Sequence, residues 1–589
     1  MDSQKIENLL NLSLNATMEE RDKSLILNVG FDQVDRTWEL IVKYHGDLEK
    51  IASEAIRVEV LAAGYAIVTL PESLIQAFTA LDEVEYIEKP KSLFFSENNA
   101  KAASCISPVT NNEPFLSGKG TIVAVIDSGI DYINMDFRNS DGTTRILSLW
   151  DQTIAPDAEK GWRSPQGFSM GVEFTKEQID EALRQPTVQE TYVRVPSRDG
   201  SGHGTAVTGI AAGNGTLSGG LYKGVAVESN LMIVKLGIPV LGFFPRTTEL
   251  MRALAYVVRK SVEYNMPIAI NLSFGNTYGA HDGTSLLERY IDNISEIGKN
   301  VICVGSGNEG NVSGHVSGVL KEKTTIELAI SNYELTLSVQ IWKNYNDNFN
   351  ITIASPSGKS FLIPLHESGT HREVMDHTQL LIYVGEPTPY SVKQEIFIDF
   401  IPVNTYIGDG VWGFIMEPVD ISQGDYNFYL PSQSARNITT GFYAPAADTT
   451  LTIPSTAGKV ITIGAYNSNL QAYADFSGRG YVLIDERSGS RKVSSVKPDI
   501  VAPGVNIMTT SASGGYDAVT GTSFATPFVT GSASLMMEWG IVMGNDPYLY
   551  GEKVKAYLIK GARRIPGFVQ WPNAQMGWGT LCVKDSLPL

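Results

Sequence analysis

Four short apolar runs, each followed by small or polar residues, limit what this chain can fold into more than any other feature. They are TIVAVID, NLMIVKL, PIAINLSF and NVICVGSG, which end at residues 127, 236, 274 and 307. Runs rich in β-branched residues and without polar alternation are typical of parallel strands covered on both faces. Among them, TTELMRALAYVVRKSVEY (247–264) has the apolar periodicity of a helix. This alternation predicts an α/β fold built on a doubly wound parallel sheet.

The patterns outside these runs divide the chain into four parts. Residues 1–96 begin with a polar leader and continue as strand–helix–strand–strand–helix–strand, which predicts a small α/β domain. An exposed linker is expected over residues 91–118. Residues 97–320 and 455–589 carry the strand–helix alternation. Residues 321–454 contain only short strands separated by Gly, Pro, Asn and Asp, which predicts an inserted β-sandwich or jelly-roll domain.

The composition limits the partners of such a fold. Hydrophobic residues make up 43% of the chain and charged residues 19%, which indicates a globular protein with a large core. The net charge of −18 argues against a nucleic-acid partner, because phosphate binding needs a basic face. No run of about 18 apolar residues is present, so no membrane span is predicted. The N-terminal residues contain no basic and then apolar signal, so we expect cytoplasmic synthesis without a signal peptide.

The cysteines indicate neither a disulfide framework nor a metal site. Cys105, Cys303 and Cys582 are the only three in 589 residues, and no CxxC pair indicates zinc. Three thiols in a chain of this size suit a reducing compartment. Cys303 lies in a predicted buried strand, so we expect it in the core. No metal ligands and no cofactor are predicted.

Three short blocks place reactive side chains beside glycines and helix starts. VIDSGID puts Asp127 at the end of an apolar strand, SGHGTAVTGIAAG puts His203 just before a helix, and GTSFATPFVTGSASLM puts Ser523 at the start of another helix. The carboxyl ends of parallel strands form the functional edge of such a sheet. Helix N-termini offer backbone donors to developing negative charge. The three blocks therefore predict one catalytic cluster formed by residues far apart in the sequence.

The chemistry of a serine nucleophile needs these residue types together. A hydroxyl is a poor nucleophile at neutral pH, so the imidazole of His203 must take the proton of Ser523. A carboxylate such as Asp127 must hold the other ring nitrogen. Asn308, in VGSGNEG, can offer a side-chain amide to the oxyanion beside the Ser523 N–H. Each residue alone has a structural alternative, such as a helix N-cap for Ser523 or a turn for Asn308.

The order Asp, His, Asn, Ser resembles that of the subtilisin-like serine protease family. The resemblance covers about residues 120–310 and 455–565, and it implies catalytic roles for the three blocks and an oxyanion role for Asn308. INLSFG (270–275) resembles the strand of the family that pairs with bound substrate. The residues expected to line the first substrate pocket, with close strand packing as the alternative, are Ser273, Gly275, Gly305 and Gly307.

Residues 24–96 resemble the propeptide of that family, a small domain that assists folding. The segment YIEKPKSLFFS resembles its C-terminal tail, which the enzyme cleaves itself. This register implies a cut near Phe95, Ser96 or Glu97. The partners implied by the resemblance are the chain's own propeptide and a protein substrate.

Some positions depart from the family pattern. Asn134 and Met135 replace a His-Pro pair, Ala206 replaces a second His, and Phe524 replaces a Met. None of these changes removes a catalytic group. The loop at 213–224 lacks a clear set of oxygen ligands like that of the family's strong calcium loop, so structural calcium is not supported.

The whole layout resembles a narrower group, the Csp germination proteases of clostridial spores. The shared features are the absence of a leader, a retained propeptide, and an insertion between Asn308 and Ser523. This resemblance implies packaging in the spore and activation of a cortex-lytic enzyme zymogen by removal of its propeptide. Some members of the group lack triad residues, whereas all three positions match here. Two alternatives stay open: a pseudoprotease or germinant-sensing module occluded by its prodomain, and a general intracellular degradative subtilase.

Overall fold

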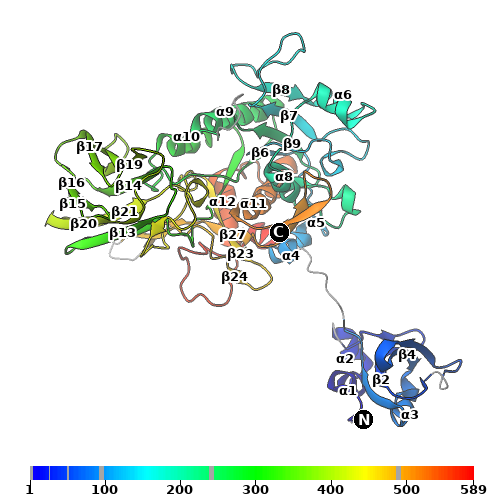
Figure 1. The fold of residues 1–589 in the computed structure, drawn as a ribbon. Helices are drawn as coiled ribbons and strands as arrows, with labels where there is room; N and C mark the ends of the chain where they lie inside the picture. The colour runs from blue at the N-terminus through cyan, green and yellow to red at the C-terminus, as the bar shows by residue number, and fades with distance from the viewer. Residues whose placement is uncertain are drawn as a thin grey trace. The chain divides into compact units, whose positions relative to one another are not determined.

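The four apolar runs form neighbouring strands of a nine-stranded sheet in this computed structural model (Figure 1). β6 (Ile122–Asp127) lies between β9 (Asn230–Lys235) and β10 (Ile268–Leu272), and β11 (Asn300–Gly305) pairs with β10. All of these pairs are parallel. The carboxyl ends of the four strands therefore lie along one edge of the sheet.

Further strands extend this sheet in both directions. β7 (Ile146–Asp151) pairs in parallel with β9, and β8 (Val172–Thr175) closes that side as an antiparallel strand. On the other side β23 (Ile461–Asn467) pairs in parallel with β11. β23 also pairs with the parallel strand β27 (Ile500–Pro503) and with the antiparallel strand β24 (Ala472–Tyr473). Residues on both sides of the insertion thus build one sheet.

Helices cover both faces of the sheet. Figure 1 shows α9 (Thr247–Tyr264) and α10 (Leu286–Ile294) on one side, and α8 (His203–Ala212) and α11 (Thr522–Met537) on the other. Every residue of β6 is buried. α12 (Glu552–Gly561) contributes Val554 and Leu558 to the same core as α8 and α11.

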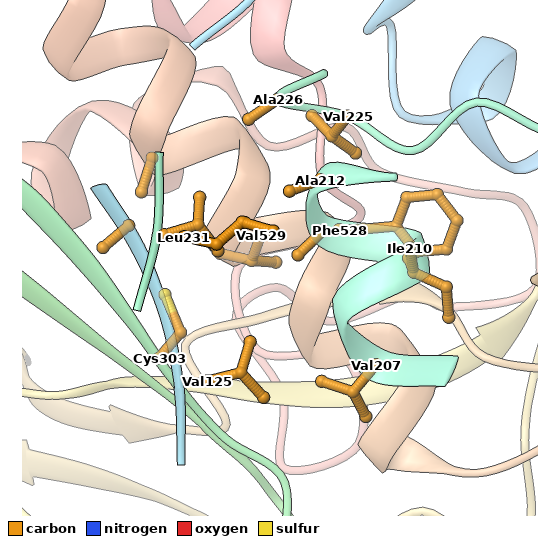
Figure 2. Close-up of a cluster of buried hydrophobic side chains, with 14 of the residues drawn as sticks. Val125, Val207, Ile210, Ala212, Val225, Ala226, Leu231, Cys303, Phe528 and Val529 are labelled. Atoms are coloured by element: carbon orange, nitrogen blue, oxygen red, sulfur yellow. The ribbon is translucent and has the colours of Figure 1, made fainter. Parts of the chain in front are cut away.

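The side chains of β6 alternate between the two helical layers. Val123 and Val125 belong to the core cluster of α8 and α11, whereas Ile122, Ala124 and Ile126 belong to that of α9 and α10. Figure 2 shows Val125 near Val207 of α8 and Val529 of α11, with Cys303 in the same cluster. The predictions of a doubly wound parallel sheet and of a buried Cys303 are confirmed.

Residues between β11 and β23 form two antiparallel sheets with a shared core. The six-stranded sheet has the order β12-β21-β14-β19-β18-β17, and the five-stranded sheet has the order β16-β15-β20-β13-β22. Phe400 of the first sheet and Trp412 of the second pack edge to face at 5.1 Å in this core. The assignment as a jelly roll stays a prediction. The strand bounds are β12 (His315–Val319), β13 (Thr324–Ile330), β14 (Leu337–Asn344), β15 (Asn348–Ala354), β16 (Ser360–Leu362), β17 (Gly369–Met375), β18 (Thr378–Val384), β19 (Lys393–Pro402), β20 (Gly410–Asp420), β21 (Asp425–Tyr429) and β22 (Gly441–Phe442).

The chain divides into two compact units, Met1–Glu97 and Asn98–Leu589. The first unit is an antiparallel sheet of order β1-β2-β4-β3, with β5 paired to β2, and three α-helices in its described residues. Its core includes Trp38 and Leu70, both fully buried. The bounds of its elements are α1 (Asn8–Asn15), α2 (Met18–Lys23), β1 (Phe31–Asp32), β2 (Thr37–Tyr44), β3 (Arg57–Leu61), β4 (Tyr65–Pro71), α3 (Ile75–Thr79) and β5 (Val84–Glu88).

One expectation about this first unit is wrong. The N-terminal residues are more than a polar leader, because Leu10 of α1 is fully buried in the core of the unit. A short amphipathic pattern does not show whether tertiary packing will bury it. The first helix expected in the strand–helix–strand pattern, over residues 45–55, falls partly on residues 49–51, which lie outside the described residues. Of the others, Leu48 has 3-10 geometry, and Ser53 and Ile56 form an isolated bridge.

The structure describes residues 4–24, 27–48, 52–91, 99–237, 245–485 and 492–588. The expected self-cleavage positions 95–97 lie outside these residues. Among the described residues, no helix has the length and apolar character needed to cross a bilayer.

The expectation of an exposed linker over residues 91–118 is partly wrong as well. Its described part forms α4 (Asn99–Ala103) and α5 (Ser107–Thr110), and Ile106 and Val109 are buried in the main core. The expectation of three free thiols is also wrong, because Cys105 forms a disulfide with Cys582 across 477 residues of sequence. The backbone N–H of Val583 donates to Ser104 O at 3.0 Å beside this link. The disulfide therefore ties the start of the second unit to its C-terminal segment.

We expect the denatured, unreduced protein to be alkylated at one cysteine, Cys303, and the reduced protein at all three. A link across so long a loop restricts the unfolded chain, so the double variant Cys105→Ser/Cys582→Ser should lose about 2–5 kcal/mol of unfolding free energy. Mass spectrometry of the alkylated chain and urea denaturation measure both effects. Three alkylated sites without reductant would contradict the disulfide.

Candidate active site

Asp127 and His203 come together at the carboxyl edge of the sheet. Asp127 is the last residue of β6 and is 5% exposed. His203 is the first residue of α8. The Nδ1 of His203 lies 2.7 Å from Oδ1 of Asp127, which also accepts the N–H of Ser128 at 2.7 Å. A carboxylate in this position makes Nδ1 the protonated nitrogen and leaves Nε2 as the basic one.

The start of α8 depends on a close approach between two backbone segments. A Cβ at Gly204 would lie 2.2 Å from Gly129 O, so only glycine fits directly after His203. Asp199 accepts the N–H groups of Gly202 and Thr205 and thereby holds the turn before the helix. The glycine-rich context of the sequence block thus sets the position of the imidazole.

Burial and charge act in opposite directions on the His203 imidazole. Burial lowers the pKa of His203, while the charge and hydrogen bond of Asp127 raise it, and Asp199 adds to that increase. The attractive contributions are larger, so the pKa lies above the ordinary value of 6.5. The charged form of the ring is therefore stabilised by the carboxylate that positions it.

Ser523 lies in the first turn of α11, close to the carboxyl end of β10. Its hydroxyl donates to Ser273 O at 2.9 Å, and the Ser273 hydroxyl donates back to Ser523 O at 2.9 Å. Among the described residues, this hydroxyl makes no hydrogen bond with His203. The Phe524 ring, next in sequence, packs against the His203 ring with centroids 5.4 Å apart. The structure thus brings the start of α11, which carries Ser523, next to His203 at the start of α8, but the Ser523 hydroxyl points to Ser273 O directly after β10.

Asn308 is oriented by the residue before Ser523. Its Oδ1 accepts both the backbone N–H and the hydroxyl of Thr522, each at 3.0 Å. The carboxamide oxygen is thereby occupied, and the Nδ2 hydrogens donate to no acceptor among the described residues. Ser523 is the second residue of α11, where helix geometry provides no acceptor four residues earlier for its N–H. Two donors, Asn308 Nδ2 and Ser523 N–H, therefore flank the same helix start.

The four residues predicted to line a substrate pocket do line one cavity. Its volume is about 210 Å³, and Asn308 and Ser523 also line it. The predicted lining residues are Ser273, Gly275, Gly305 and Gly307. A separate cavity of about 520 Å³ is lined by His203, Ala206 and Phe524. Hollows therefore lie next to both the nucleophile candidate and the imidazole.

Sequence reasoning missed several residues of this site. Glu309, Ser432 and Ser434 line the smaller cavity, and Asp199 supports His203. Glu309 stands directly after Asn308 and Asp199 four residues before His203, so the sequence blocks could have indicated both. No local signal marks the two serines, because they come from the inserted sheets.

The carboxylate of Asp136 accepts a hydrogen bond from the loop at 213–224 and holds it in place. Its Oδ1 accepts the N–H of Leu217 at 3.0 Å, and its Oδ2 accepts the hydroxyls of Thr510 and Tyr516 at 2.9 and 2.6 Å. No group of three or more His, Cys, Asp or Glu side chains able to hold a metal ion occurs within the ranges that the structure describes. Both oxygens of the Asp136 carboxylate thus accept hydrogen bonds from the protein itself.

Comparisons with known proteins show which family the chain belongs to. Residues 4–91 match the Csp protease B prodomain model, and residues 118–372 and 421–579 match the subtilase family model. The chain is 23% identical to the PIII-type proteinase of Lactococcus lactis subsp. cremoris (strain SK11) over 80% of its length. It is 24% identical to the minor extracellular protease Vpr of Bacillus subtilis (strain 168), also over 80%. It spans 24% of the length of the first relative and 52% of the second.

The chain therefore belongs to the subtilase family, the subtilisin-like serine endopeptidases, as the sequence predicts. Within that class, its fold is similar to the structure of the Clostridium perfringens CspB protease. The two share 34% sequence identity and a TM-score of 0.75, over 83% of this chain and 97% of that one. The first unit accordingly corresponds to a prodomain of the CspB type.

We expect the His203 pKa, measured by NMR titration in the Ser523→Ala protein, to lie above 6.5. Asp127→Asn should lower it, because the charge that raises the pKa is removed while the burial that lowers it remains. Asp409 is an exposed acid between β19 and β20, so Asp409→Asn is the matched control and should leave the His203 pKa unchanged. A pKa in the Asp127→Asn protein equal to or above the unaltered value would contradict the assigned contact.

Chelation by EDTA should leave the thermal midpoint unchanged, because protein donors already satisfy Asp136. Asp136→Ala should lower the unfolding free energy by about 1–3 kcal/mol, since the buried Thr510 hydroxyl and the partly buried Tyr516 hydroxyl and Leu217 N–H lose their acceptor. Scanning calorimetry with and without chelator measures both effects. A midpoint that falls with EDTA and recovers with calcium would show that this loop holds a metal.

Proposed function

We propose that this chain hydrolyses peptide bonds through an acyl-enzyme, with Ser523 as nucleophile, His203 as base and Asp127 as the group that orients the base. The 2.7 Å contact between Asp127 and His203, beside the helix start that carries Ser523, is the observation that carries the proposal. In that arrangement the basic Nε2 of His203 takes the hydroxyl proton as Ser523 attacks the substrate carbonyl. The same nitrogen then returns the proton to the leaving amine.

The oxyanion of this reaction would be held by Asn308 Nδ2 and the Ser523 N–H. The double acceptance of Thr522 by Asn308 Oδ1 supports this role, because it fixes the amide before any charge develops. The residues proposed to bind the substrate are Ser273, Gly275, Gly305 and Gly307. The two cavities next to Ser523 and His203 fit a substrate that extends to both sides of the bond being cut.

The reaction requires one local change. The Ser523 hydroxyl must rotate about χ1 away from Ser273 O, a step between staggered rotamers. Hydrogen bonds between catalytic groups are often long or misaligned without substrate and tighten when it binds. In this resting arrangement the Ser523 hydroxyl donates to Ser273 O and is not yet bonded to the imidazole.

The first cut that we propose is in the chain itself, near residue 96, between the prodomain and the second unit. The match of residues 4–91 to the Csp protease B prodomain supports this proposal. The similarity to the CspB protease further supports a role in spores, where the enzyme would activate the zymogen of a cortex-lytic enzyme during germination. Protein made in the cytoplasm would then be packaged in the spore.

A second candidate is a binding or sensing module whose nucleophile stays inactive. The observation in its favour is the Ser523 hydroxyl bonded to Ser273 O instead of His203. A general degradative protease is the third candidate, and it would digest casein broadly where a zymogen activator cuts few bonds. Labelling of the nucleophile separates the second candidate from the other two.

We expect the purified protein to be cut near residue 96 and to react with a fluorophosphonate at Ser523. Ser523→Ala should stay full length and unlabelled, because this change removes the proposed nucleophile. Ser360→Ala, at an exposed serine of the inserted unit, should behave like the unaltered protein. Intact mass and N-terminal sequencing locate the cut.

The possible failures of this experiment differ in meaning. A Ser523→Ala chain that is still cut near residue 96 in a protease-free preparation would refute self-cleavage. Absence of label in the full chain, with label in the isolated second unit, would indicate inhibition by the prodomain. Absence of label in both would favour the inactive module.

A further inference from the structure

A stack of three buried rings lies where the inserted sheets meet the α/β part. Tyr429 of β21 lies between His281, in the segment after β10, and His315 of β12. The centroid of the Tyr429 ring is 3.9 Å from that of His281 and 4.5 Å from that of His315, and the planes differ by 17° and 19°. His281 is 5% exposed and the other two residues are 3% exposed. Two titratable rings are thus held in the interior against the two faces of one tyrosine.

The imidazole of His281 joins two backbone segments. Its Nδ1 lies 2.6 Å from Leu451 O and its Nε2 lies 3.1 Å from Thr277 O. A neutral ring carries one N–H and donates to only one of these carbonyls, whereas a charged ring would donate to both. His281 also has a φ of 51°, which is uncommon for a residue with a Cβ, so the contacts around it must hold this conformation.

His315 has acceptors near both ring nitrogens as well. Its Nε2 lies 3.0 Å from Asn427 Oδ1 and its Nδ1 lies 3.2 Å from Ala446 O. The N–H of Ala446 in turn donates to His315 O at 2.8 Å. His315 therefore fastens β12 to the segment that leads back toward β23.

Burial opposes a positive charge on either histidine. It lowers the pKa of His281 to about 4; the charges of His315 and Lys393 add to this decrease, and the two backbone carbonyls oppose it. Burial also lowers the pKa of His315, against the effects of Asn427 and Asp448. Both rings are therefore neutral in the packed stack at neutral pH.

The other titratable groups around the stack come from both parts of the fold. Lys393 of β19 pairs with Asp282 at 3.1 Å, directly after His281 in the chain. Glu309 lines a small cavity together with His281 and His315, and burial raises its pKa. Within the described residues neither imidazole forms an ion pair with a carboxylate. A proton gained by the packed stack would therefore lack a bonded counter-charge.

The contacts around His281 extend to the smaller cavity. Leu451, whose carbonyl faces Nδ1, precedes Thr452, and Thr452 lines that cavity. Two residues before His281, the N–H of Gly279 donates to Gln340 Oε1 of the inserted sheets at 2.9 Å. Opening of the stack would therefore loosen both the contact between the two parts and one wall of the cavity.

We propose that the stack of His281, Tyr429 and His315 is an acid-sensitive contact between the inserted sheets and the α/β part, which loosens when its histidines take up protons. The pKa of His281 is about 4 in the packed stack and returns to about 6.5 when the stack opens. Between these two values the open form binds a proton that the packed form does not, so packing weakens as the pH falls through this range. Above it both forms carry the same charge, and packing no longer depends on pH.

Hydrogen exchange of backbone amides in the full-length chain tests this proposal without relying on activity, which His203 would also affect. Exchange is measured at about pH 5, 7 and 8 and corrected for the intrinsic rate, in peptides that contain Gly279 or Thr452. From His281 alone, the open fraction should be about 20-fold larger at pH 5 than at pH 7 and nearly equal at pH 7 and 8. Peptides from β6 are the internal reference and should stay protected throughout.

Two variants keep a ring on each face of Tyr429 and remove a site for a proton. His281→Phe should reduce the rise in exchange between pH 7 and 5 by about 10-fold or more, judged against its own value at pH 8. His315→Phe should also reduce it. The control His366→Phe changes a histidine whose side chain is 84% exposed and should keep the full rise. Glu309→Gln should keep it too, because its carboxyl is not the source of the effect.

The unaltered protein alone can overturn the proposal, so a variant that fails to fold does not weaken the test. Equal exchange near Gly279 and Thr452 at pH 5 and 7 would contradict an acid-sensitive contact. An equal rise in the β6 peptides would show general unfolding in acid instead. A full rise in the folded double variant His281→Phe/His315→Phe, or its loss in Glu309→Gln, would assign the effect to other groups.

Discussion

The burial of β6 on both faces is the constraint on which the rest of the structure depends. Its side chains alternate between two helical layers, so the interior of the strand has no place for a charge. The first position where a carboxylate can meet a polar partner is the carboxyl end, and Asp127 stands there. His203 reaches it because Gly204 lets α8 begin against the backbone of Gly129. Asp127 and His203 thus meet where the buried apolar part of β6 ends.

The helix α11 links this cluster to the core. Its first turn carries Ser523 and orients Asn308 through Thr522, while Phe528 and Val529 pack between the sheet and α8 (Figure 2). The position of the nucleophile candidate is therefore as well determined as the core itself. The direction of its hydroxyl is not determined in the same way, because a single rotatable bond decides between Ser273 O and the imidazole. A resting and a reactive site can share one backbone.

The inserted sheets contribute Ser432 and Ser434 to the lining of the cavity beside Ser523. They are fastened to the α/β part by buried stacked rings and by hydrogen bonds around Glu309 and Thr277. Those contacts lie on the loops that follow β10 and β11, the two strands whose glycines open the pocket. The inserted sheets are therefore packed against the strands around the cavity beside Ser523. A change in the packing of the sheets is expected to alter the shape of the cavity.

Local patterns in the sequence predict the parallel sheet and single out Asp127, His203, Asn308 and Ser523, which the structure places close together. The apolar runs predict buried strands, and each of the four residues stands in a short block that contains glycine. The blocks of His203 and Ser523 also mark the start of a helix. The Cys105–Cys582 link, the burial of Leu10 and the place of Ser432 and Ser434 in the lining of the smaller cavity were decided by the tertiary structure. Each depends on segments that meet only when distant elements pack together, and no local spacing records which surfaces will meet.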